Sequence, residues 1–73
     1  MMDIQSFLLY RYCMNGKEVI RKLEAEGWTL ARVSGSHYIM RKNEKGVPVP
    51  VHGHKDLGKG LIAKIERETG VKL

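Results

Sequence analysis

Residues 28–51 read WTLARVSGSHYIMRKNEKGVPVPV, a pattern that predicts three consecutive β-strands. Two runs rich in β-forming residues, 28–33 and 37–42, are separated only by Ser-Gly-Ser at 34–36, which predicts a tight hairpin. In the third run, 47–51, valines alternate with prolines. Because proline cannot donate a hydrogen bond to a neighbouring strand, this third strand should lie at an edge of the sheet.

Two amphipathic helices are expected on either side of the strands. Apolar residues recur at helical spacing over 16–26, where Asn15 suits the N-cap and Glu18 stands three residues later in a capping-box arrangement. A second apolar stripe spans 60–69, and Gly70 should end that helix. The order helix, three antiparallel strands, helix predicts an α+β fold with both helices on one face of the sheet.

The sequence leaves open which face of the strand 37–42 is buried. One face would carry His37, Ile39 and Arg41, and the other Tyr38, Met40 and Lys42. Each set mixes apolar and polar side chains, so alternation alone does not decide between them. Trp28, Tyr38 and Met40 are expected in the core rather than stacked on a nucleobase.

Length and composition limit the class of protein. With 73 residues the chain has room for one small core, and 13 Lys and Arg against 8 Asp and Glu give a net charge of +5. Such a charge favours a polyanionic partner. A single cysteine excludes an intrachain disulfide, and the apolar run 7–10 is too short for a signal peptide or membrane span. We therefore expect a cytoplasmic protein.

The first thirteen residues differ in character from the rest of the chain. They contain the only cysteine, Cys13, and Met14 then stands like an initiator just before the first helix. We expect 1–13 to be an N-terminal extension and 14–73 to be the folded domain, with translation naturally starting at Met14. The alternative is that residues 7–12 add a strand or helical turn to the core, or contact a partner.

Several short motifs carry a resemblance to a known family. They are Asn15-Gly16-Lys17-Glu18-Val19-Ile20, Gly27-Trp28, Gly35-Ser36-His37, Val49-Pro50-Val51-His52-Gly53 and Lys59-Gly60. Over nearly all of residues 14–73 the chain resembles the HicA family of toxins. The resemblance implies the fold of a double-stranded RNA-binding domain, cleavage of mRNA by a single histidine, and a HicB antitoxin that releases the toxin only under stress.

In this chain the resemblance assigns the catalytic role to His37. An imidazole changes protonation near neutral pH, so it can take a proton from a ribose 2′-hydroxyl or give one to the leaving oxygen. Judged without the resemblance, a lone histidine beside a turn is more often structural. The predicted RNA contacts are Gly35, Ser36, Arg41, Lys42, Lys55 and Lys59. The alternative is that the first two only form a tight turn and that each cation is only a solvated charge. His52 is expected to help shape the site.

A metal or other cofactor is not expected. His52 and His54 form a His-x-His pair, but zinc usually takes three or four ligands, and neither a cysteine nor an acidic cluster accompanies them. The prediction is a metal-independent endoribonuclease, the toxin of a type II toxin-antitoxin system, acting on single-stranded or loosely structured mRNA. The alternatives are a non-catalytic RNA-binding module and a protein-interaction domain that uses the open sheet face.

Overall fold

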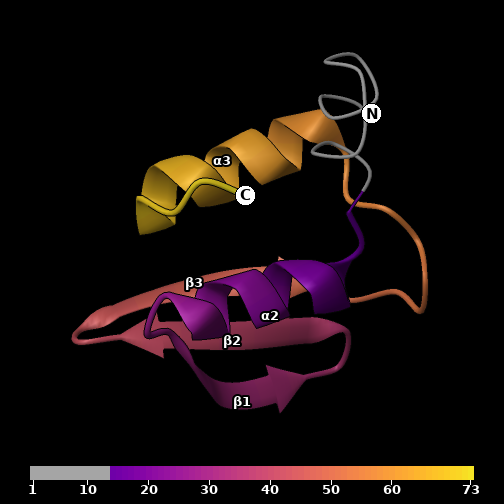
Figure 1. The fold of residues 1–73 in the computed structure, drawn as a ribbon. Helices are drawn as coiled ribbons and strands as arrows, with labels where there is room; N and C mark the ends of the chain where they lie inside the picture. The colour runs from indigo at the N-terminus through magenta and orange to yellow at the C-terminus, as the bar shows by residue number, and fades with distance from the viewer. Residues whose placement is uncertain (1–13) are drawn as a thin grey trace.

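The computed structural model describes residues 14–73, and these residues form the predicted α+β fold (Figure 1). The elements are α2 (Gly16–Ala25), β1 (Thr29–Ser34), β2 (His37–Lys42), β3 (Lys45–Pro50) and α3 (Lys59–Thr69). Their order and the antiparallel sheet confirm the arrangement of a double-stranded RNA-binding domain. The proposed extension, residues 1–13, lies outside the described part of the chain.

The three strands form one sheet in the order β1-β2-β3, so β2 is central and β3 is an edge strand as predicted. The third strand begins at Lys45, two residues earlier than the valine pattern indicates. The reason is the turn before it, where Asn43 adopts a left-handed backbone with φ 56° and the connection shortens to Asn43 and Glu44. Asparagine is one of the few residues that tolerates this conformation.

Burial settles which face of β2 points inward. Met40 is fully buried, and it pairs with the buried Val47 of β3, while Tyr38 pairs with the buried Val49. The same face is covered by the helices, whose buried residues include Leu23 of α2. As expected, Trp28 and Met40 belong to the core and Tyr38 packs against it. His37, Ile39 and Arg41 therefore point to the opposite, outer face.

The helices form where the sequence predicts them. The Asn15 side chain accepts a hydrogen bond of 3.0 Å from the Glu18 amide and so caps α2, and Gly70, with φ 73°, ends α3. In Figure 1, α2 lies across the sheet and α3 runs beside β3. Ile62 and Ile65 of α3 are buried in the same core as α2, so α3 closes that core at the β3 edge. Neither helix of residues 14–73 is long and apolar enough to cross a membrane.

The start of α2 lies directly against the end of β3. A Cβ atom on Gly16 would collide with the carbonyl oxygen of Pro50 and lie 2.7 Å from Cγ2 of Val51. Pro50 is the β3 residue that pairs with His37. The close approach of α2 to Pro50 therefore also helps to position His37.

Gly16→Ala should lower the free energy of unfolding by about 1 to 3 kcal/mol, because the added methyl group overpacks a backbone contact that cannot yield easily. Gly60→Ala is the matched control, since a Cβ in that first turn of α3 meets nothing within 4 Å. We expect the control to be neutral or stabilising by at most about 1 kcal/mol. Urea denaturation measures both, and equal stabilities of the two variants would contradict the packing described.

Candidate functional site

His37 stands at the start of β2 with an exposed side chain on the outer face of the sheet. It pairs with Ser34 of β1 on one side and with Pro50 of β3 on the other. The two-residue turn before it contains Gly35 with φ 59°, a backbone that suits glycine. The amide of Val51 donates a 2.7 Å hydrogen bond to the carbonyl oxygen of Ser36, so the turn is held to the end of β3.

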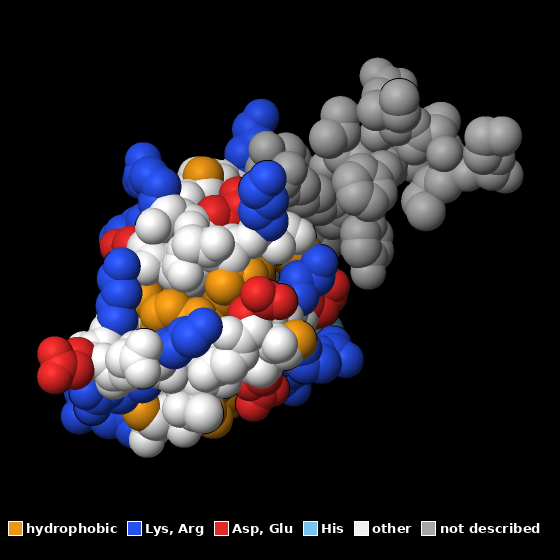
Figure 2. Space-filling view, turned by 60° about the vertical axis from the view of Figure 1, so that its left-hand side comes forward, with side chains coloured by type: hydrophobic (Ala, Val, Ile, Leu, Met, Phe, Trp, Pro, Cys, Tyr) orange, Lys and Arg blue, Asp and Glu red, His pale blue; other side chains and the backbone are white. Residues whose placement is uncertain are grey.

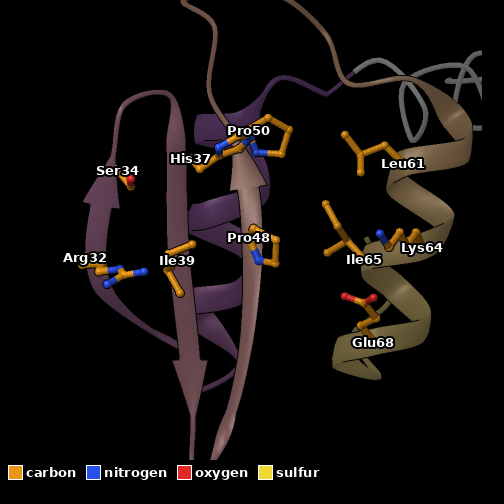
Figure 3. Close-up of a pocket in the computed structure, with 10 residues that line it drawn as sticks. All are labelled: Arg32, Ser34, His37, Ile39, Pro48, Pro50, Leu61, Lys64, Ile65 and Glu68. Atoms are coloured by element: carbon orange, nitrogen blue, oxygen red, sulfur yellow. The ribbon is translucent and has the colours of Figure 1, made fainter.

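A groove of about 450 Å³ lies beside His37, between the outer face of the sheet and α3 (Figure 3). The sheet contributes Arg32, Ser34, His37, Ile39, Pro48 and Pro50 to its lining. Successive residues of a strand point to opposite faces, so these side chains all come from alternate positions on one face. The pairing register of the strands therefore determines which side chains line the sheet side of the groove.

The other wall of the groove comes from α3. Leu61 and Ile65 extend from the helix toward the prolines of β3, as Figure 3 shows, and Lys64 and Glu68 stand beside them. The floor between β2 and α3 is therefore apolar, while polar and charged groups stand toward its sides. A predominantly apolar groove with a few converging polar groups is the usual character of a ligand site.

Within residues 14–73, no hydrogen bond or ion pair engages the His37 side chain. His37 is exposed and lines the groove, so a bound molecule can approach its side chain. A general acid or base needs such access to the atom whose proton it transfers. The geometry suits proton transfer to or from a ligand lying in the groove.

The predicted RNA contacts nearest to His37 separate into two groups. Gly35 and Ser36 form the turn that leads into it, whereas Arg41 shares its face but pairs with Gly46, outside the groove lining. Lys42 points to the other face, where its Nζ donates a 2.9 Å hydrogen bond to the Glu26 carbonyl at the end of α2. The structure therefore brings the turn, but not Lys42, together with His37.

The remaining predicted residues lie in and after the loop that links β3 to α3. His52, His54 and Lys55 are exposed, and the Lys55 amide donates a 3.0 Å hydrogen bond to the His52 carbonyl. Lys59 is the first residue of α3. None of these four lines the groove. No group of three or more potential metal ligands occurs among residues 14–73.

Arg32, Ser34 and Lys64 line the groove but were not singled out by the sequence pattern. A two-residue turn at 35–36 would have placed Ser34 opposite His37 and hence Arg32 on the same face. No comparable local signal exists for Lys64, because its place depends on how α3 packs along β3.

Positive charge is not gathered into one patch on the face seen in Figure 2. Lys and Arg side chains alternate there with Asp and Glu side chains around an apolar hollow. The net charge of +5 therefore acts mainly as a general attraction for polyanions on this side, and specific contacts must come from individual cations.

Comparison with known proteins identifies a matching family and a similar relative. The family model described as the HicA toxin of bacterial toxin-antitoxin matches residues 16–71, a range that includes both helices, the sheet and His37. The chain is also similar to the probable mRNA interferase HicA of Pseudomonas fluorescens (strain Pf0-1). The two are 36% identical over 59 residues, which cover 81% of this chain and 98% of that relative.

Lys42→Gln should lower the midpoint of thermal unfolding by roughly 2 to 5 °C, because it removes a charged donor from the carbonyl end of α2. Arg41→Gln, which removes the same charge from the adjacent residue on the outer face, should change the midpoint by less than about 1 °C. Differential scanning fluorimetry would measure both variants. A larger loss for Arg41→Gln would contradict the structural role given to Lys42.

Proposed function

This chain belongs to the HicA toxin family, and from that premise we propose that it is an endoribonuclease that cleaves mRNA as the toxin of a type II toxin-antitoxin system. The observation that carries the proposal is the exposed His37 side chain in the lining of the groove. The printed name of the Pseudomonas relative, probable mRNA interferase, supports the same activity.

In the proposed reaction the ribose 2′-oxygen is the nucleophile. It forms a bond to the neighbouring phosphorus while the bond from phosphorus to the 5′-oxygen of the next nucleotide breaks. The products are a 2′,3′-cyclic phosphate and a 5′-hydroxyl. His37 accepts the proton of the 2′-hydroxyl or donates one to the departing 5′-oxygen, and water serves the other position. Neither step calls for a metal or cofactor.

General acid-base assistance by one group accelerates a reaction by about 10² to 10⁴-fold. A nuclease that relied on His37 alone would therefore be slow, and positioning of the RNA would have to supply the rest of the acceleration. The apolar floor formed by Ile39 and Pro48 offers a surface to an unstacked base. We therefore propose single-stranded or loosely structured mRNA in the cytoplasm as the substrate.

The proposed protein partner is a HicB-type antitoxin. The groove is open, so a protein that covers it would deny RNA access to His37. An acidic surface on that antitoxin would complement the net charge of +5 on the toxin. Release of the antitoxin under stress would then expose the site.

We propose residues 14–73 as the functional domain. Met14 is fully buried in the core, and its carbonyl oxygen accepts a 2.7 Å hydrogen bond from the Leu57 amide. The hydrogen bond ties Met14, two residues before the start of α2, to the loop that precedes α3. The domain therefore includes Met14 as part of its packing.

The purified chain should cleave a labelled mRNA in excess EDTA, and His37→Ala should abolish cleavage because it removes the proton-transfer group. His54→Ala is the matched control, since this histidine is exposed in the loop after β3 and does not line the groove. Gel electrophoresis measures the cleavage. A 2′-deoxy substitution at the cleaved position should block it, because the nucleophile is then missing.

Cleavage by His37→Ala at the wild-type rate would refute the proposed role of His37. If the wild type and His37→Ala both retard the RNA on a native gel but leave it intact, the chain is a non-catalytic RNA-binding module. If neither binds RNA in a salt-dependent way, a protein-interaction domain is the better description.

A further inference from the structure

Arg32 lies on the same face of the sheet as His37. It is on the neighbouring strand, two residues away from Ser34, the residue that pairs with His37. Ser34 pairs with His37 and Arg32 pairs with Ile39, so the arginine and the histidine belong to adjacent strands and successive rows. Figure 3 shows the Arg32 side chain extending from β1 toward Ile39. Rows two residues apart in a strand are separated by roughly 7 Å, a span that a long arginine side chain can bridge.

The Arg32 guanidinium has no internal partner within residues 14–73, where no hydrogen bond or ion pair engages it. Among the described residues lining the groove, the one acid is Glu68, and it stands on α3 one turn from Lys64. Lys64 belongs to the α3 wall, whereas Arg32 stands on the sheet face that also carries His37. Arg32 is therefore a cation of the groove whose charge is available to a ligand beside His37.

We propose that Arg32 is a second catalytic residue, whose guanidinium binds the non-bridging oxygens of the phosphate that is cleaved beside His37. The inference rests on the proposed endoribonuclease activity and deepens it. Guanidinium groups form paired hydrogen bonds with phosphate oxygens in a fixed planar geometry. Bound in this way, the phosphate would lie between the arginine and the imidazole, with the 2′-hydroxyl and the 5′-oxygen within reach of His37.

Such a contact would act most strongly in the transition state. As the 2′-oxygen attacks, phosphorus becomes five-coordinate and negative charge builds up on its non-bridging oxygens. A fixed cation placed where charge develops stabilises the transition state more than the bound substrate. Ile39, which pairs with Arg32, and Pro48, which pairs with Ile39 on its other side, make the neighbouring floor of the groove apolar, and this strengthens the attraction.

The two residues would then divide the work. His37 moves a proton, and Arg32 compensates the charge that proton transfer alone leaves on the phosphate. This division accounts for how a groove with one imidazole can support cleavage without assigning a second acid or base.

The test compares Arg32→Gln, Arg32→Lys and Arg21→Gln by single-turnover cleavage of one single-stranded RNA in EDTA, beside the wild type and His37→Ala. Arg21 is exposed on α2, the helix that covers the opposite face of the sheet, so its variant loses the same charge away from the groove. We expect Arg32→Gln to cleave about 10²-fold more slowly at saturating enzyme. Arg32→Lys should recover part of the rate, and Arg21→Gln should cleave like the wild type.

Wild-type cleavage by Arg32→Gln would overturn the role of Arg32 and leave that of His37 intact. A weaker affinity for RNA with an unchanged rate at saturation would also overturn it, since Arg32 would then only bind. Cleavage by His37→Ala would instead refute the proposed function itself. Thermal unfolding checks that each variant is folded. If Arg32→Gln fails to fold, the cleavage rate of Arg32→Lys decides the test.

Discussion

Burial of Met40 is the constraint on which the rest of the structure depends. This residue is fully buried at the centre of the sheet, opposite Val47 and beneath the helices. Side chains alternate along a strand, so a shift of one residue would put His37 in the core and Met40 in water. The apolar contacts of the inner face thus determine which side chains, including His37, are exposed on the outer face. Stability and the position of the site have the same origin.

The candidate site lies on the outer face of the sheet, in a fold that this chain shares with double-stranded RNA-binding domains. Such domains contact RNA phosphates and 2′-hydroxyls across successive grooves. Here the outer face of the sheet and the flank of α3 form a groove with an apolar floor, lined also by two cations and one acid. The fold is shared with duplex binders, whereas the apolar floor of the groove supports our proposal that the substrate is an unpaired segment of RNA.

The sequence predicts the order of elements, the cap at Asn15, the end of α3 at Gly70 and the edge position of β3, because each depends on local propensity. It leaves the inner face of β2 undecided, since both faces mix polar and apolar residues, and only packing against the helices resolves this. Lys42 illustrates the limit. Its charge suggests an RNA contact, but its place on the inner side of the sheet leads it to the Glu26 carbonyl. The groove wall from α3 is likewise a tertiary feature without a local signal.

The most direct test of the central claim, that RNA lies on the outer face of the sheet, is an NMR titration of inactive His37→Ala with a short single-stranded RNA. The account predicts amide shift changes at Arg32, Ser34 and Ile39, with Arg21 on α2 unaffected. Changes confined to α2 and to the start of α3 at Lys59, with none on the outer face, would contradict it.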